Sequence, residues 1–346
     1  MSLRTPLCDL LGMEIPILNV GFGGGAPAEL AAAVSNAGGF GVVGGTVPVE
    51  TGLGFIRRAR ELTERPLGIN LIIAGQEEPE TAGELAAMAE AYVAEGVDAL
   101  IVFWGDPAPY VPAAHAAGAK VLVQVGSVEE AEDAAAAGVD AVILQGVEAG
   151  GHVKATESIW KHLPLAVDAV RPVPVLASGG IGDGVGIARA LGLGAQGVSL
   201  GTRFVACEEA SVNADYRGRV VAARAEDTWY GTLFDVGWPD APHRVLRNRA
   251  VDEWEAAGRP QSGKRPGEGD VIGMRDGREV VRYQAAMATG QFEGEVELAA
   301  LWAGESCEVV NDVLPARDIV RRLVDEFYSV TTYSNEAQQS TAKSTS

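Results

Sequence analysis

The sequence has little of what a disulfide framework, a metal site or a nucleic-acid surface requires. It holds three cysteines, Cys8, Cys207 and Cys307, without a Cys-x-x-Cys spacing, so neither a disulfide framework nor a zinc site is indicated. No cluster of His, Glu and Asp has the spacing of metal ligands. Basic residues are scarce, because 27 Lys and Arg stand against 47 Asp and Glu, which gives a net charge of −20. This excess argues against nucleic acid and anionic membrane surfaces as partners.

Long apolar segments are missing as well. The N-terminus lacks the apolar core of a signal peptide. No apolar run approaches the length needed to span a bilayer, so no membrane association is expected. These absences predict a cytoplasmic protein, and they leave a homodimer open as its assembly. The segment 331–346 is polar and patternless, which predicts a disordered tail.

What the sequence does contain is a repeated unit of an Ala-rich helix, a glycine and a short apolar strand. Glycine is the usual residue at the end of a helix, because it adopts the left-handed conformation without strain. Strands that are apolar throughout and alternate with helices indicate a parallel sheet covered on both faces. Eight such strands predict an α/β fold of the (β/α)8 TIM-barrel type, with an open doubly wound sheet as the alternative. The expected strands lie at 15–18, 40–43, 67–71, 99–102, 121–123, 141–144, 173–177 and 198–200.

The repeat stops after residue 200. The segment 210–311 contains four tryptophans and a Gly- and Pro-rich stretch at 258–267, and a helical pattern resumes at 314–325. We therefore expect a TIM barrel formed by residues 1–209 and 312–330. The segment 210–311 is expected to be a smaller, mainly helical inserted domain that closes over the barrel and sets substrate choice. Its Tyr230, Trp238 and Tyr283 are candidates for the wall of the substrate pocket, although packing within the insert is the alternative for each.

The segment Gln145–His152 directly follows one of the predicted strands. Gly150 and Gly151 let the backbone turn there, so that His152 can face a ligand rather than a core. Histidine suits proton transfer near neutral pH. We therefore expect His152 to be the catalytic residue. The chain's other histidines lack such glycines, and packing is the simpler interpretation of each: His115, His162 and His243.

Polar groups follow several of the predicted strands, whose carboxyl ends form the active-site face of such a barrel. Asn70, Gln124 and Gln145 carry amides that donate and accept hydrogen bonds, which suits a heteroaromatic ring with N–H and C=O groups. The loops 178–184 and 201–203 are of the kind that binds a phosphate in these barrels. Together these features predict FMN, and no Gly-x-Gly-x-x-Gly follows the first strand to indicate a Rossmann site. The expected FMN-binding residues are Gly21, Phe22, Gly23, Asn70, Gln124, Gln145, Gly150, Gly151, Ser178, Gly179, Gly180, Gly182, Gly201 and Thr202.

These motifs are recognisable. Gln145–His152, supported by 31–39, 178–181 and 200–204, resembles the nitronate monooxygenase family, formerly called 2-nitropropane dioxygenases, over most of the chain. The resemblance implies an FMN-dependent oxidation of alkyl nitronates by O2 to a carbonyl compound and nitrite. It assigns catalysis to His152 and makes Glu148 a residue that orders the loop. His152 would remove the α-proton of a neutral nitroalkane or hydrogen-bond the nitro oxygens, and the sequence does not choose between these roles.

The chain departs from the family pattern at two positions. Phe22 stands where the family commonly has methionine, and Glu305 stands where it often has glutamine, so we expect Glu305 to point to solvent. Two other functions stay open. One is a related FMN-dependent NAD(P)H:quinone or enoyl-thioester reductase, which shares the barrel and the FMN loops. The other is a non-catalytic FMN- or metabolite-binding protein.

Overall fold

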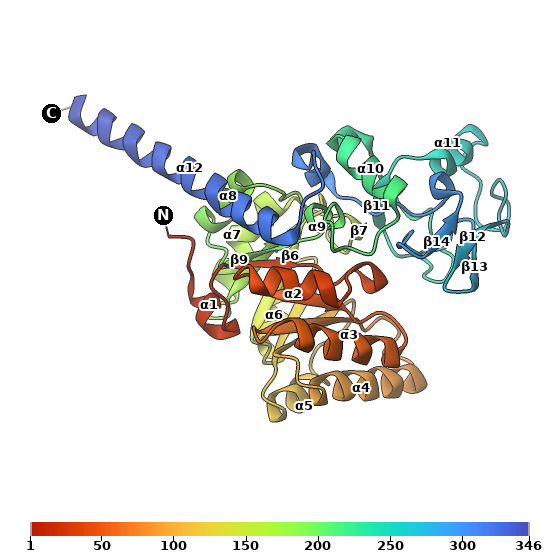
Figure 1. Cartoon of the computed structure of the whole chain (residues 1–346), viewed down its shortest axis with the longest axis horizontal. Helices are drawn as coiled ribbons and strands as arrows, with labels where there is room; N and C mark the ends of the chain where they lie inside the picture. Colours follow the sequence, from red (N-terminus) through yellow and green to blue (C-terminus); the bar gives the residue numbers. More distant parts are fainter. Residues whose placement is uncertain (1, 345–346) are drawn as a thin grey trace.

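Eight parallel strands form the centre of the molecule (Figure 1). The computed structural model describes residues 2–344, and it describes the side chains of residues 2–332. All eight expected strands are present, in the order β1-β9-β8-β6-β5-β4-β3-β2, and helices lie between them, so the predicted α/β barrel is confirmed. The strands are β1 (Ile17–Asn19), β2 (Gly41–Gly44), β3 (Leu67–Ile72), β4 (Ala99–Phe103), β5 (Lys120–Val125), β6 (Ala141–Gln145), β8 (Val175–Ser178) and β9 (Gly197–Leu200).

The barrel closes between β1 and β2 through few backbone contacts. A parallel bridge joins Leu18 to Phe40, and the Phe40 N–H donates to the Ile17 carbonyl at 3.0 Å. The buried side chain of Asn19 supplies further bonds, because its Nδ2 donates to the Val42 carbonyl at 2.7 Å and its Oδ1 accepts from the Val42 N–H at 2.9 Å. An amide side chain thus replaces part of the ladder at the seam.

The apolar core has an inner and an outer part, as alternating side chains require in a barrel. Leu18, Phe40, Ile101 and Ile143 belong to the inner cluster, which side chains of α1 (Pro6–Leu11) also join. The larger outer cluster lies between the strands and the helices. The helices after α1 are α2 (Ala28–Asn36), α3 (Val49–Leu62), α4 (Pro79–Ala94), α5 (Val111–Ala116), α6 (Val128–Ala136), α7 (Ile159–Ala169), α8 (Gly184–Gly192) and α9 (Thr202–Val205).

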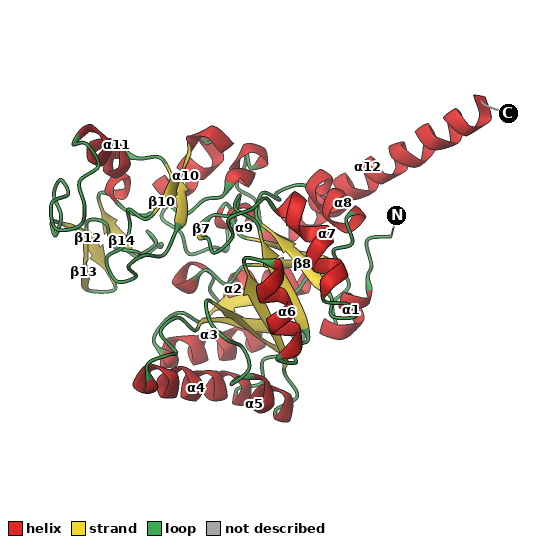
Figure 2. Ribbon diagram, turned by 180° about the vertical axis from the view of Figure 1, so that it is seen from behind, coloured by secondary structure: helices red, strands yellow, loops and turns green. Residues whose placement is uncertain are grey.

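The segment 210–311 lies at one end of the molecule, beyond the mouth of the barrel (Figure 1, Figure 2). It is mixed rather than mainly helical, because two α-helices and three short 3-10 helices accompany five short strands. One three-stranded sheet has the order β10-β11-β7, in which β7 (Gly151–His152) comes from the barrel part of the chain, and a second has the order β13-β12-β14. The elements are α10 (Ala214–Ala222), β10 (Thr228–Gly231), β11 (His243–Leu246), α11 (Arg249–Ala256), β12 (Val271–Arg275), β13 (Arg278–Val281) and β14 (Phe292–Gly294).

The last helix, α12 (Ala316–Ser344), packs on α8 and then extends away from the barrel (Figure 1). It begins close to the expected position, but it includes most of the segment 331–346 that was expected to be a disordered tail. No glycine or proline occurs between 316 and 344, so nothing in the sequence ends the helix earlier. Residues 345–346 lie outside the described residues. Within the described part of the chain, no helix is long and apolar enough to cross a membrane.

Candidate active site

A cavity of about 460 Å³ lies at the carboxyl ends of the barrel strands. Apolar side chains of the inner barrel form its floor, and loops from β1, β2, β6, β8 and β9 form its rim. Of the fifteen site residues expected from the sequence, only Gly182 is not part of the lining. The expected residues that line the cavity are Gly21, Phe22, Gly23, Asn70, Gln124, Gln145, Gly150, Gly151, His152, Ser178, Gly179, Gly180, Gly201 and Thr202.

The insert holds the loop that carries His152. Gly151 and His152 form the short strand β7, which pairs antiparallel with Arg244 and His243 of β11. The Val153 N–H continues this contact by donating to the carbonyl of Pro242 at 2.8 Å. Strand pairing with a segment that is distant in sequence therefore fixes the backbone at His152.

Gln145 fixes the same loop from the barrel side. Its Nε2 donates to the His152 carbonyl at 3.0 Å, and its Oε1 accepts from the Lys154 N–H at 2.9 Å. Although Gln145 lines the cavity, its amide hydrogen-bonds the backbone of the loop and is therefore not free for a ligand.

Two charged side chains complete the support of this loop. Glu148 accepts a bond from the Ile159 N–H at 3.1 Å and another from the Ser158 hydroxyl, so it caps α7 and orders the loop as expected. The buried Arg244 donates to the Val147 carbonyl at 2.8 Å and forms an ion pair with Glu305 at 3.1 Å. The side chain of Glu305 is 38% exposed, so it reaches solvent as expected, but it also pairs with a buried cation, which the sequence did not indicate.

The imidazole of His152 lies among aromatic rings. Trp238 stacks on it with ring centroids 3.9 Å apart, and the Trp302 ring centroid is 5.1 Å away. Its Nε2 is buried and has no hydrogen-bond partner among the described residues. Burial lowers the pKa of His152 to about 3, and the nearby His243 also lowers it. The ring is therefore neutral at physiological pH.

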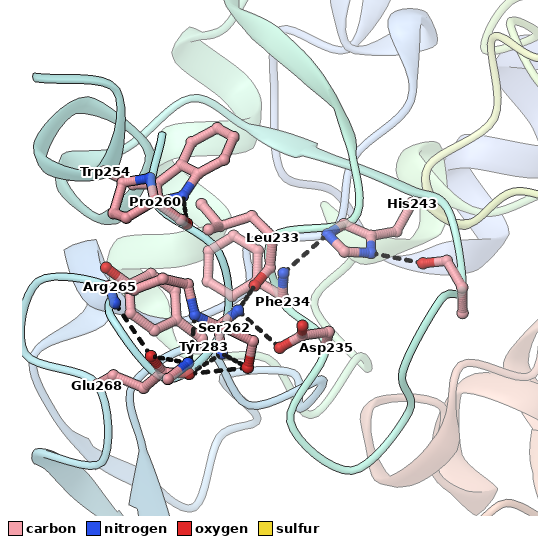
Figure 3. A network of polar contacts seen from close by, with 12 residues as sticks. Leu233, Phe234, Asp235, His243, Trp254, Pro260, Ser262, Arg265, Glu268 and Tyr283 are labelled. Carbon is pink, nitrogen blue, oxygen red and sulfur yellow. Dashed lines mark hydrogen bonds and ion pairs between the residues drawn. The ribbon is translucent and has the colours of Figure 1, made fainter. Parts of the chain in front are cut away.

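His243 has a structural role in the insert (Figure 3). It is fully buried, its Nε2 accepts from the Phe234 N–H at 3.1 Å, and its Nδ1 lies 3.0 Å from the Ala241 carbonyl. Because a carbonyl only accepts, Nδ1 carries the proton, and burial lowers the pKa of His243 to about 4. Figure 3 also shows Arg265 bound to Asp235 and Glu268. These bonds keep the segment that follows β10 in place.

The glycine loops after β8 and β9 offer backbone N–H groups to the cavity. Gly179 and Gly180 both have positive φ angles, of 97° and 67°, which favour glycine. Among the described residues neither donates its N–H to a protein acceptor. Gly201 precedes α9, and a Cβ added there would meet only Val20 within 4 Å, at 3.7 Å. These two loops therefore have room and donors for an anion.

The last part of the predicted phosphate loop 178–184, at the start of α8, does not line the cavity, which differs from the expectation. The Gly184 N–H donates to Glu326 of α12 at 2.8 Å, and Asp183 accepts from the Gly186 N–H. Gly182 packs near Val309 and Ser306 instead of lining the cavity. Arg203, next to Thr202, is buried against Asp312, at 3.0 Å.

The insert supplies a further part of the cavity wall. Of the three wall residues expected from the sequence, only Trp238 lines the cavity. Tyr283 belongs to the insert's own core, and Tyr230 is 38% exposed and does not line the cavity. The packing alternative therefore holds for Tyr283. The lining residues of the insert are Val236, Gly237, Trp238, Arg275, Gln284, Ala285, Ala286, Met287, Trp302 and Ser306. Scattered residues of this kind leave no motif in the sequence.

Comparison with known proteins identifies the relatives of this chain. The sequence model of the nitronate monooxygenase family matches residues 4–326. A nitronate monooxygenase of Pseudomonas aeruginosa is 32% identical, with 92% of this chain and 97% of the relative covered. A (3aS,4S,5R,7aS)-5-hydroxy-7a-methyl-1-oxo-octahydro-1H-indene-4-carboxyl-CoA dehydrogenase of Mycobacterium tuberculosis is 31% identical, with 94% and 96% covered. The structure of a nitroalkane oxidase from Streptomyces ansochromogenes has a TM-score of 0.74 and 26% identity, with 94% and 99% covered.

Proposed function

Because the chain belongs to the nitronate monooxygenase family, we propose that it oxidises alkyl nitronates with O2 to a carbonyl compound and nitrite. It is an oxidoreductase by this membership. The observation that carries the proposal is the neutral imidazole of His152, which lines the cavity at the barrel mouth and whose buried Nε2 has no hydrogen-bond partner among the described residues. A cytoplasmic location and the homodimer stay predictions.

FMN is the proposed cofactor, and two observations favour it. The Asn70 Oδ1 is buried at the cavity without a hydrogen-bond partner, which is costly unless a ligand donates to it. The free N–H groups of Gly179 and Gly180, with the open space at Gly201, suit a phosphate. We propose that these loops hold the phosphate and that Asn70 and Gln124 hydrogen-bond the ring. The chemistry that FMN supplies when bound is electron transfer from the substrate to O2.

His152 contributes a neutral imidazole to this reaction. With its pKa lowered to about 3, it is a weak base when the cavity holds no anion. A neighbouring anion favours the charged form and raises the pKa of a histidine. A nitronate beside Nε2 would therefore raise the pKa of His152 and strengthen the hydrogen bond that the ring donates to the nitronate. This favours a role in holding a pre-ionised nitronate over removal of a proton from a neutral nitroalkane.

We further propose that the segment 210–311 is a lid and substrate domain. Trp238 and Trp302 cover His152 from the insert side, and β11 joins the insert to β7. Exclusion of water by such a wall strengthens electrostatic interactions inside the site. An apolar wall above a polar rim suits a small substrate with an alkyl chain.

Replacing Trp238 with alanine is expected to change substrate preference. Loss of the indole opens space beside His152, so kcat/KM for long-chain nitronates should rise relative to short ones by a few-fold, since each methylene group is worth about 0.8 kcal/mol. Tyr230→Ala is the matched control, because Tyr230 does not line the cavity, and its preference should stay that of the unmodified enzyme. The measurement is kcat/KM over a series of 1-nitroalkane nitronates. Identical preferences in both variants would contradict the lid proposal.

Nitrite release from the nitronate of 1-nitropropane, with O2 uptake, tests the proposed activity. The main competitor is an FMN-dependent reductase or dehydrogenase that acts on thioesters, which the 31% identity to the carboxyl-CoA dehydrogenase favours. Anaerobic addition of NADH separates them, because a reductase bleaches its flavin rapidly and a nitronate oxidase barely does so. We expect nitrite with slow bleaching. Rapid bleaching without nitrite would establish the reductase, and flavin with neither reaction would indicate a binding protein.

A further inference from the structure

One cation stands in the cavity wall without an internal counter-ion. Arg275, at the end of β12, is the one charged side chain among the described lining residues, since His152 is neutral. It is half-buried, and its Nη1 donates to the Met287 carbonyl at 3.1 Å. No described carboxylate forms an ion pair with it. Because a guanidinium has five N–H donors, most of those of Arg275 are left for a ligand.

The four arginines of this chain that are more deeply buried than Arg275 behave differently. Each of the four that are least exposed has a carboxylate partner, namely Arg203 with Asp312, Arg244 with Glu305, Arg265 with Asp235 and Glu268, and Arg282 with Glu253. Acidic residues are in large excess, so partners for a purely structural arginine are abundant. Arg217, which is half-buried as well, also lacks a carboxylate partner, but its Nη2 donates to the carbonyls of Ala210 and Val212 and it does not line the cavity. Arg275 combines a missing carboxylate partner with a place in the cavity wall, which points to an anion that the protein does not itself supply.

We propose that Arg275 determines specificity by binding an anionic group, such as a carboxylate, that the substrate carries away from its reacting atoms. This rests on the proposed function for the identity of the reacting group. Arg275 and His152 line the same cavity, while the rest of the insert's wall is uncharged, with Trp238, Trp302 and Met287 as its largest members. A substrate that spans the cavity thus meets a neutral imidazole and a lone guanidinium.

Arg275 lies on a different element from the loops proposed for the cofactor phosphate, which follow β8 and β9. Arg275 lies on the insert and bonds Met287, whose thioether packs near Gly25 after β1, whereas the free N–H groups lie in the loop after β8. A phosphate of the cofactor is nevertheless an anion, so the flavin content of the variant must be measured. Removal of Arg275 should leave that content unchanged.

The first test measures binding without turnover and without relying on nitronate chemistry. Trp238 and Trp302 share the cavity with Arg275, so tryptophan fluorescence reports a ligand there. Hexanoate and hexanamide differ in charge at similar size. The flavin-bound protein should bind hexanoate more tightly, and Arg275→Met should weaken hexanoate binding about tenfold, as expected for a hydrogen bond to a charged group, with hexanamide unaffected. Arg275→Lys should restore part of the preference.

A matched control is available on the neighbouring strand. Arg278 of β13 faces Arg275 in the register of the two strands, but it is exposed and does not line the cavity. Arg278→Met changes the net charge by the same amount and should leave hexanoate binding unchanged. Equal binding of hexanoate and hexanamide by the unmodified protein, or equal losses in both variants, would overturn the proposal.

The second test uses turnover. The nitronates of 4-nitrobutanoate and 1-nitrobutane have chains of equal length, and only the first carries a carboxylate. Arg275→Met should lower kcat/KM about tenfold for the first alone. Equal losses on both would place Arg275 at the reacting group, and loss of flavin would place it at the cofactor phosphate, so either result would overturn the proposal. Charge-selective binding without any nitrite release would refute the proposed function but retain the anion site.

Discussion

Nitronate turnover by a His152→Ala variant is expected to be at least about 10²-fold below that of the unmodified enzyme, the lower range for a residue that acts directly in catalysis. The variant should keep its fold and its flavin, because the bonds that fix this position come from the backbone. The His152 carbonyl accepts from Gln145, and the strand β7 pairs through its main chain. Only the imidazole and its stacking with Trp238 are removed. The measurement is nitrite release at saturating substrate, with flavin content taken from the absorbance spectrum.

The matched control for this variant is His162→Ala, which removes an imidazole on α7 that does not line the cavity. It should retain full turnover. An unchanged rate in the His152 variant would end the proposal that this residue carries the chemistry. If His152 removes a proton, activity on neutral nitroalkanes falls much further than activity on nitronates. Equal losses on both substrates support the hydrogen-bonding role proposed above.

The pH profile gives an independent check on the same residue. A pKa of about 3 means that His152 gains a proton only when the pH falls towards that value, so it is neutral throughout pH 5–8 as long as no anion lies beside it. The profile of kcat/KM for a pre-formed nitronate reports groups of the free enzyme, and it should show no step from His152 in this range. The His152→Ala variant should therefore have a profile of the same shape at a lower level. A step between pH 6 and 7 that the variant abolishes would contradict this.

Loss of bound flavin is the expected result of Gly201→Asp. Gly201 has φ −94°, which any residue adopts, and a Cβ there meets only Val20 at an ordinary distance. The aspartate can thus enter the cavity without straining the backbone, and its charge opposes a phosphate. Like charges placed together cost several kcal/mol, so FMN affinity should fall by roughly 10²-fold or more. The measurement is the flavin-to-protein absorbance ratio after gel filtration.

Gly201→Asn separates charge from bulk in this experiment, because asparagine has nearly the shape of aspartate. It should lose much less flavin than the aspartate variant. Gly180→Asp is a weaker test of the same site, since Gly180 has a φ of +67° and an added Cβ would lie 3.0 Å from the Glu148 side chain. Misfolding and charge repulsion would then be confounded. If the Gly201→Asp variant keeps its full flavin content, the phosphate must bind elsewhere.

Much of the barrel could be predicted from the sequence because its signals are local. A strand buried on both faces must be apolar along its whole length, and a glycine ends the preceding helix, so each unit is recognisable within about ten residues. A glycine with a positive φ angle ends the helix before six of the eight strands, whereas the helices before β3 and β8 end at Thr63 and Val170. The position of His152 at the cavity was also predictable, since a strand end followed by Gly150 and Gly151 directs the chain toward the rim. The hydrogen bonds of the Gln145 amide were not predictable, because its partners are backbone groups of His152 and Lys154, and the path of that loop is set by the tertiary structure.

The insert shows what only the tertiary structure decided. Trp238 and Tyr283 are both aromatic residues in an irregular segment, yet one stacks on His152 and the other lies in a separate core. The insert is joined to the His152 loop by the pairing of β7 with β11, two segments about ninety residues apart, and no short pattern encodes that pairing. Charge partners are equally non-local. Glu305 forms an ion pair with Arg244, whereas Arg275 has no carboxylate partner among the described residues. In both cases the fold, and not the neighbouring residues in the sequence, determines which groups surround the charge.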